Sequence, residues 1–264
     1  MREEEEARKG QITAEAAKVY EDFFVPALFG QFGPWLAEAA GIGGGRVLDV
    51  ATGTGVAARA ARDRGAAVTA VDINEGMLSV ARRLAPGIEF LRAAAEALPF
   101  GEDAFDAVTC QFGLMFFDDR SRALTEMARV CRPGGRVAVA VFAGWRESPG
   151  YRDLIPLIGE IVGAEAAEAL KAPFVLGGAG VLEALLAEAG LGGAAVSERI
   201  GRIRHASLDA WLDTEIGGWT LASMVDAPTL AALKSAARDR LSACCQPDGA
   251  VSFDAPARFA VATV

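Results

Sequence analysis

Between residues 46 and 142, short apolar runs alternate with segments in which apolar residues recur every three or four positions. The runs predict buried strands and the longer segments predict amphipathic helices. We expect strands over 46–51, 67–72, 88–91, 105–111 and 136–142, and helices over 55–64, 75–85 and 119–131. Strands that alternate with helices form a parallel sheet with helices on both faces. The pattern therefore predicts an α/β fold.

Local residues set the ends of these elements. Asn74 is expected to cap the second helix, and Asp118 or Asp119 the third, because Asn and Asp side chains accept the unpaired amides of a helix start. Pro86-Gly87 would end the second helix. Pro133-Gly134-Gly135 has the composition of a turn and would lead into the fifth strand.

The pattern changes on both sides of this alternation. Residues 11–40 favour helix, with breaks expected at Pro26 and Gly33-Pro34. After 142 we expect helices over 150–173, 180–189 and 207–245, a strand over 194–205 and an extended stretch over 251–264. The whole would be a Rossmann-like, mostly parallel seven-stranded sheet that ends in an antiparallel hairpin. We divide the chain into an N-terminal helical lid segment (1–45), a core (46–145) and a remainder (146–264) whose helical insertions form a substrate lid.

Composition excludes several classes of function. Apolar residues make up 52% of the 264, enough to bury a full core. The net charge of −9 disfavours a nucleic-acid partner, whose phosphates need a basic surface. No apolar run approaches the roughly 18 residues of a membrane span, and the opening residues resemble no secretory signal, so we expect a cytoplasmic protein. The four cysteines lack the spacing of a zinc site, and no metal site is expected.

The most informative stretch joins a strand, a glycine turn and a helix. Val47 to Val50 form the strand, Gly53-Thr54-Gly55 the turn, and the helix follows at once. Glycine lets the backbone approach a flat ligand, and the helix start supplies unpaired N–H groups. With Ala58 the turn also fits the dinucleotide pattern G-x-G-x-x-G/A. However, a nicotinamide-binding protein would normally carry an aliphatic residue in the place of Asp49. The hydroxyls of Thr52 and Thr54 suit a ligand with ammonium and carboxylate groups as well as they suit a pyrophosphate.

Three motifs in this order resemble one family. Asp49-x-Ala51-Thr52-Gly53-Thr54-Gly55 resembles the first motif of the class I S-adenosylmethionine-dependent methyltransferases. Residues 94–100, followed by Phe105-Asp106, resemble the D-A-E-x-L-P-F…F-D segment of the ubiquinone and menaquinone biosynthesis type. Residues 129–137 resemble that type's R-V-L-[RK]-P-G-G motif, which is structural. The resemblance covers about 47–142 and implies S-adenosylmethionine as the cofactor.

The expected cofactor contacts lie at the carboxyl ends of the strands. Asp72 ends the second strand, where a carboxylate accepts the hydroxyl protons of a ribose diol. The family's adenine-binding aspartate is replaced by Ala94, so we expect the Ala95 backbone, with Glu96 or a water, to serve the adenine. The cofactor contacts predicted in all are Asp49, Ala51, Thr52, Gly53, Gly55, Asp72, Ile73, Met77, Ala94, Ala95, Glu96, Gln111 and Phe112.

Catalytic residues are less marked in the sequence. His205, the only histidine, is a candidate general base, with a structural role as the alternative; Arg202 and Arg204 would depress its pKa if close. Tyr20 is the second candidate, since the resemblance implies an N-terminal aromatic residue that closes over the cofactor. Five further aromatic residues could line an acceptor pocket: Trp145, Tyr151, Phe174, Trp211 and Trp219.

These features favour methyl transfer to a small hydrophobic or aromatic metabolite, with an oxygen or carbon acceptor atom, by a protein that could form a homodimer. One alternative is an S-adenosylmethionine-binding protein without methyl transfer, either a binding module or a pericyclic catalyst. An NAD-dependent oxidoreductase is the other, disfavoured by Asp49 and by the lack of a Tyr-x-x-x-Lys pair.

Overall fold

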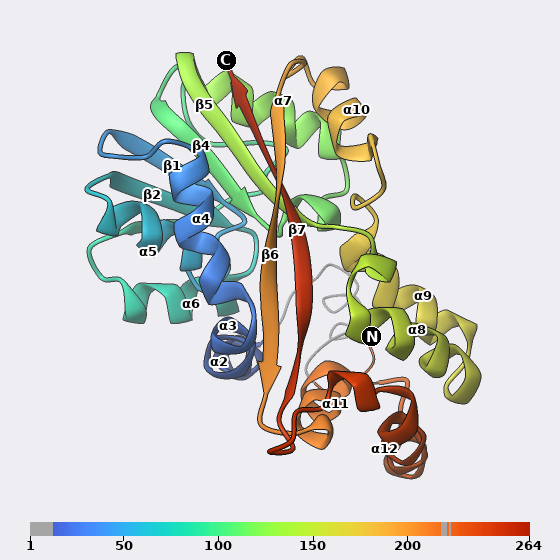
Figure 1. Ribbon diagram of the computed structural model, residues 1–264. Coiled ribbons are helices and arrows are strands. Elements are labelled where there is room, and N and C mark those ends of the chain that lie inside the picture. The colour runs from blue at the N-terminus through green and yellow to red at the C-terminus, as the bar shows by residue number, and fades with distance from the viewer. Residues whose placement is uncertain (1–12, 218–220, 222) are drawn as a thin grey trace.

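The computed structural model describes residues 13–217, 221 and 223–264. Within them the chain forms one seven-stranded sheet in the order β3-β2-β1-β4-β5-β7-β6 (Figure 1). The strands are β1 Arg46–Val50, β2 Ala67–Asp72, β3 Glu89–Arg92, β4 Phe105–Gln111, β5 Cys131–Phe142, β6 Ala195–His205 and β7 Val251–Thr263. β1 to β5 run parallel, and β7 is antiparallel to both β5 and β6. The predicted fold class is confirmed.

The sheet order reverses between β3 and β4, which lies on the other side of β1. Because crossovers between parallel strands are right-handed, this reversal places helices on opposite faces. α5 (Val56–Asp63) and α6 (Glu75–Leu84) cover one face, and α7 (Arg120–Val130) covers the other (Figure 1). The carboxyl ends of β1, β2 and β4 meet at the reversal, where a ligand is expected in this architecture.

Both predicted helix caps are confirmed. The Asn74 side chain accepts the Met77 amide at the start of α6 (3.1 Å), and the Asp119 carboxylate accepts the Arg122 amide at the start of α7 (2.8 Å). Of the two aspartates considered for α7, Asp119 is therefore the cap.

The predicted turn at Pro133-Gly134-Gly135 is wrong, because this segment already belongs to β5. Gly134 takes a left-handed φ of +74°, and its amide donates to the carbonyl of Val264 (2.8 Å). The pairing of β5 with β4 shifts register between Phe105 and Ala107. The end of the chain thus keeps this irregular stretch extended.

The N-terminal helical segment breaks at a different place from the one expected. It consists of α2 (Ala14–Val19), a π-helical turn (Tyr20–Phe24), α3 (Val25–Ala27), a 3-10 turn (Phe29–Gln31) and α4 (Phe32–Ala39). Gly33-Pro34 lies in the first turn of α4, where proline is tolerated because its missing N–H has no intrahelical partner. Pro26 lies at the start of α3. The helical conformation is interrupted at Leu28, with φ of −146°.

The later helices gather beside the sheet. They are α8 (Pro149–Ile161), α9 (Ala164–Lys171), α10 (Val181–Glu188), α11 (Leu208–Gly217) and α12 (Ala227–Arg240). The single helix expected over 150–173 is split by Gly163, with φ of +129°, and the one over 207–245 is split into α11 and α12. In Figure 1, α8, α9, α11 and α12 lie together beyond one side of the long antiparallel pair of β6 and β7. That they form a substrate lid stays a prediction.

Candidate cofactor and acceptor site

Two neighbouring strand ends hold strained backbone. Ala51 follows β1 with φ of +54°, and Phe112 follows β4 with φ of +53°. Residues other than glycine pay about 1–3 kcal/mol for such a conformation, and it clusters at functional sites. Gly113 allows the two ends to approach, since a Cβ on it would lie 2.5 Å from the Ala51 Cβ. The strain therefore lies at the sheet reversal where a ligand is expected.

The glycine turn presents its backbone beside these ends. Gly53 and Gly55 have left-handed φ values of +56° and +88°, which explains why glycine stands at both positions. A Cβ on Gly53 would meet no described atom within 4 Å, whereas one on Gly55 would lie 3.4 Å from the Phe90 ring. The open side of the turn is therefore at Gly53.

Asp49 lies beneath the turn. Its carboxylate, 1% exposed, accepts the Thr52 hydroxyl at 2.6 Å and the Thr109 hydroxyl at 2.8 Å. Burial raises the pKa of Asp49 to about 6, and the two hydroxyls oppose that shift. In this structure Asp49 thus organises the turn from below, and its direct contact with a cofactor stays a prediction.

Asp72 faces the turn from the end of β2. One carboxylate oxygen accepts the Gly53 amide and the other the Asn74 amide, both at 2.8 Å. Burial raises the pKa of this carboxyl, while the backbone amides hold it down. Asp72 is therefore fixed beside the open side of Gly53, as a ribose-binding carboxylate requires.

The carboxyl ends of β1, β2 and β4 form a corner, which we call the cofactor corner. Tyr20 covers it from the N-terminal segment. Its ring centroid lies 5.1 Å from that of Phe29. The residue begins the short π-helical turn, and such turns are frequent at functional sites. Burial raises the pKa of the Tyr20 hydroxyl, and the nearby Glu21 and Asp72 charges raise it further. The structure thus brings Tyr20, Asp72 and the turn together.

Arg59 of α5 links the same N-terminal segment to the turn. Its guanidinium donates to the Thr54 carbonyl at 2.6 Å and to the Glu21 carboxylate at 3.0 Å. The two charged side chains are only 21% and 18% exposed, so water screens this pair weakly. Sequence analysis missed both residues, since no local pattern connects positions 38 apart.

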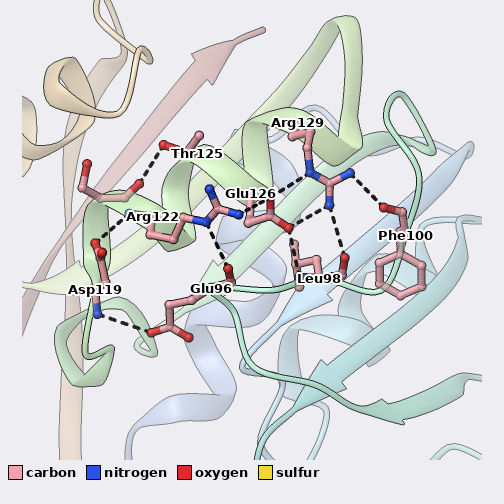
Figure 2. Close-up of polar contacts among 9 residues, drawn as sticks. Glu96, Leu98, Phe100, Asp119, Arg122, Thr125, Glu126 and Arg129 are labelled. Atoms are coloured by element: carbon pink, nitrogen blue, oxygen red, sulfur yellow. Dashed lines mark hydrogen bonds and ion pairs between the residues drawn. The ribbon is translucent and has the colours of Figure 1, made fainter.

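The predicted adenine loop, residues 94–100, lies against α7. Figure 2 shows the Glu96 carboxylate turned toward the start of α7, where it accepts the Asp119 amide at 3.5 Å. The Glu96 carbonyl accepts Nε of Arg122 at 3.2 Å. Ala94 is half-buried and Ala95 is buried. The use of Glu96 as the missing adenine acceptor stays a prediction. In this structure its carboxylate instead joins the loop to the start of α7.

A buried ion pair anchors this loop. Glu126, 4% exposed, accepts the Leu98 amide at 3.0 Å. Arg129 donates to both Glu126 oxygens at 2.7 Å, to the Phe100 carbonyl at 2.9 Å and to the Leu98 carbonyl at 3.2 Å (Figure 2). The hydrogen bonds from Arg129 lower the pKa of Glu126. Sequence analysis placed Arg129 in a structural motif but missed Glu126, although a Glu and an Arg three apart on a helix signal such a pair.

The remaining predicted contacts surround the same corner. Ile73 is 47% exposed beside Asp72, and Met77 is half-buried in the first turn of α6. Gln111 ends β4 and donates to the Phe29 carbonyl at 3.2 Å. Its Oε1 is buried and, within the described part of the chain, has no hydrogen-bond partner; the same holds for Oγ1 of Thr54.

These observations test whether S-adenosylmethionine fits. Buried polar atoms in folded proteins are nearly always paired, so the two unpartnered oxygens mark places for a ligand's donors. The ammonium and ribose hydroxyls of the cofactor supply such donors. With the Asp72 carboxylate beside the open face of Gly53, the residues fit the group.

The two catalytic candidates lie on different sides of the N-terminal segment. His205 ends β6 and lines a hollow of about 690 Å³ with Val19 and Phe23, whose side chains are exposed. Tyr20 packs inward on Phe29. Burial lowers the pKa of His205 to about 4. Burial is the one cause of this shift, so Arg202 and Arg204 do not contribute the effect expected if they were close, and the Arg202 guanidinium pairs with Asp254 (2.8 Å). The structure therefore does not bring His205 and Tyr20 together.

Three of the five aromatic residues proposed for the acceptor pocket form one cluster. The ring centroid of Tyr151 lies 4.9 Å from that of Phe174 and 6.0 Å from that of Trp211. Trp145 instead lies under the guanidinium of Arg146 at 4.0 Å. Trp219 falls outside the described residues. Phe142 connects this cluster to the cofactor corner, since its ring contacts those of Phe174 and Phe112.

This cluster holds a carboxylate that sequence analysis missed. Glu215 accepts the Tyr151 hydroxyl at 3.0 Å and the Trp211 indole N–H at 3.3 Å, both on Oε2. Burial raises the pKa of Glu215 to about 7. An acidic residue in an amphipathic helix gives no sequence signal of burial.

Comparison with known proteins agrees with this geometry. Residues 48–139 match the family model described as a methyltransferase domain. The demethylmenaquinone methyltransferase of Renibacterium salmoninarum is 48% identical over 100 residues, which are 38% of this chain and 42% of that protein. The ubiquinone/menaquinone biosynthesis C-methyltransferase of Geobacter sulfurreducens is 45% identical over 109 residues, 38% of this chain and 43% of that one.

Among solved structures, a putative type II methyltransferase from Anaeromyxobacter dehalogenans superposes with a TM-score of 0.62 at 21% identity, covering 89% of this chain and 95% of that one. The likeness to this solved structure shows the Rossmann-like fold, and residues 48–139 match a methyltransferase domain. The motif-based resemblance is confirmed for that domain. The matched stretches span only about two fifths of the curated relatives' length.

Proposed function

We propose that this chain is an enzyme that transfers the methyl group of S-adenosylmethionine to a small hydrophobic or aromatic acceptor. The observation that carries the proposal is the pairing of Asp72 with the Gly53 amide at 2.8 Å, under Tyr20, in a domain of the methyltransferase family. A carboxylate beside an open glycine turn binds a ribose and lets the backbone approach the rest of the ligand.

Each part of the corner has a role in this proposal. Asp72 accepts the ribose hydroxyls, the 94–96 loop borders the adenine, and Oε1 of Gln111 accepts the ammonium of the methionine part. The cofactor supplies an electrophilic methyl on its sulfonium. Tyr20 and Phe29 cover the corner and exclude water, which aligns the acceptor for an in-line displacement.

The acceptor class follows from the cluster beside the corner. Rings at Phe142, Phe174 and Tyr151 continue from Phe112 toward the later helices, and apolar, aromatic surroundings of this kind favour a flat apolar acceptor. The two curated relatives are named for demethylmenaquinone and for ubiquinone/menaquinone biosynthesis, which supports a ring-bearing acceptor. None of the helices over the described ranges is long and apolar enough to cross a bilayer, and we place the enzyme in the cytoplasm.

Transfer of label tests this function. The protein is incubated with S-adenosylmethionine that carries a labelled methyl group, together with a panel of phenols and naphthoquinols. We expect label in the organic extract and S-adenosylhomocysteine in equal amount, both dependent on protein and acceptor. Cofactor binding without label in any acceptor would favour the non-methylating alternative. NAD binding in its place would favour the oxidoreductase.

A further inference from the structure

We propose that Glu21 is the charged partner of the ammonium group in the methionine part of S-adenosylmethionine, with Oε2 of its carboxylate as the acceptor. This inference rests on the proposed function and deepens it, because it gives the N-terminal segment a direct polar contact with the cofactor in addition to the cover that Tyr20 and Phe29 form. Glu21 lies ahead of the matched methyltransferase domain at residues 48–139.

Three buried oxygens without a hydrogen-bond partner point to a ligand with several donors. Among the residues that the structure describes, the buried side-chain oxygens that lack a partner are Oε2 of Glu21, Oγ1 of Thr54 and Oε1 of Gln111. Thr54 belongs to the glycine turn, Gln111 ends β4, and Glu21 lies in the π-helical turn with Tyr20, which covers the cofactor corner. Buried polar atoms are nearly always paired, and an ammonium carries three N–H donors. These acceptors therefore suit an ammonium.

Arg59 fixes the Glu21 carboxylate beside the glycine turn. Its guanidinium donates to Oε1 of Glu21 at 3.0 Å and to the Thr54 carbonyl at 2.6 Å, so one side chain joins the two residues. Oε1 is thereby used, whereas Oε2 stays unpaired within the described ranges. The Glu21 side chain is only 18% exposed, and a buried carboxylate oxygen is costly unless a donor satisfies it. Oε2 is therefore suited to a donor from outside the chain.

The second neutral acceptor, Gln111, is connected to Glu21 through the N-terminal segment. Nε2 of Gln111 donates to the Phe29 carbonyl at 3.2 Å, which orients the amide and leaves Oε1 as the unpaired atom. The Phe29 ring centroid lies 5.1 Å from that of Tyr20, the residue before Glu21. A charged acceptor forms the stronger hydrogen bond, so Glu21 would contribute more to the affinity for an ammonium than the amide does.

The charges around the corner also favour a cation. Asp49 lies beneath the glycine turn, Asp72 faces it and Glu21 borders it, which places three carboxylates around one site. In the described part of the chain, Arg59 is the cation that pairs with one of them. The charges of Glu21 and Asp72 both raise the pKa of the Tyr20 hydroxyl, so the two carboxylates act on the same place. S-adenosylmethionine carries two positive charges, on its sulfonium and its ammonium, against one carboxylate, and so complements this surplus.

The experiment compares two ligands that differ in one ammonium group. Binding of S-adenosylhomocysteine and of its desamino analogue, in which a hydrogen replaces the ammonium, is measured by calorimetry on the full chain. We expect S-adenosylhomocysteine to bind about tenfold or more tightly, the ratio that one charge-assisted hydrogen bond gives. Glu21→Gln keeps the shape of the side chain but removes its charge, and should reduce this ratio to about threefold or less without weakening the desamino analogue.

Two further variants make the test decisive. Glu21→Asp keeps the charge but withdraws the carboxylate by one methylene group, and should reduce the ratio in part. Asp22→Asn is the matched control: this neighbouring carboxylate is 44% exposed and pairs with Lys18, so its loss should leave the ratio unchanged. If Glu21→Gln fails to fold, Glu21→Asp carries the test, and an undiminished ratio in it overturns the proposal.

The outcomes separate this inference from the proposed function. An undiminished preference for S-adenosylhomocysteine in Glu21→Gln, or equal binding of the two ligands by the wild type, overturns the ammonium contact and leaves the cofactor assignment intact. Equal weakening of both ligands in Glu21→Gln would give Glu21 a structural role in the cover and also overturns the contact. A wild-type protein that binds neither S-adenosylmethionine nor S-adenosylhomocysteine overturns the proposed function itself.

Discussion

Arg129→Leu should destabilise the protein through the loop that borders the predicted adenine position. The change removes two bonds to Glu126 and two to the carbonyls of Leu98 and Phe100, and leaves the buried Glu126 charge with only the more distant Arg122 guanidinium, at 3.6 Å. Breaking a buried pair on one side costs about 3–5 kcal/mol. The Arg129 side chain is 29% exposed, so water replaces part of the interaction and about 2–3 kcal/mol remains.

The assay is urea unfolding followed by circular dichroism. At a slope of about 1–3 kcal/mol per molar urea, the midpoint should fall by about 1 M with an unchanged slope. Arg122→Leu is the matched control on the same helix: its guanidinium lies 3.6 Å from Glu126 and its side chain is 57% exposed, so the loss should stay below about 1 kcal/mol. Equal losses in the two variants would refute the reasoning that burial gives the Arg129 pair its strength.

Two further changes test the packing and the buried carboxyls. Gly113→Ala should cost about 1–3 kcal/mol, because its Cβ would lie 2.5 Å from that of Ala51, whereas Gly87→Ala, with no described neighbour within 4 Å, should be nearly neutral in the same urea assay. Burial raises the pKa of Asp49 to about 6 and of Glu215 to about 7, so the folded protein keeps protons that the unfolded chain has released. The free energy of unfolding should therefore fall as pH rises from about 4 to about 7, and Glu215→Gln should remove the part of the fall above about pH 6 in unfolding curves measured across this range. An identical pH slope in the variant would contradict the assignment.

The parts of the fold that depend on local pattern could be predicted from the sequence. The alternation of short apolar runs and amphipathic segments placed the core strands, because the central strands β1 and β4 are buried along nearly their whole length. The caps at Asn74 and Asp119 were predictable for the same reason, since a cap bonds within three residues of itself. The cofactor corner followed from motifs whose spacing the sheet order brings together.

What depends on distant partners could not be predicted. Residues 133–135 carry a turn composition, but the Val264 carbonyl, at the other end of the chain, holds them in β5. Arg59 meets Glu21, and Tyr151 meets Glu215 across 64 positions, without any periodic signal. A charged residue in a helix favours exposure by pattern alone, and only packing shows that Glu215 is buried.

The central claim is that the corner between β1, β2 and β4 binds S-adenosylmethionine. The most direct test is calorimetry of S-adenosylmethionine and S-adenosylhomocysteine on the wild type and on Asp72→Ala, with NAD as the control ligand and Asp63→Ala, an exposed carboxylate of α5, as the control variant. We predict micromolar binding of both ligands, weakened about tenfold or more by Asp72→Ala and unchanged by Asp63→Ala, because Asp72 faces the Gly53 turn whereas Asp63 is exposed on α5. Binding of NAD with neither sulfur ligand bound, or full affinity in Asp72→Ala, would contradict the account.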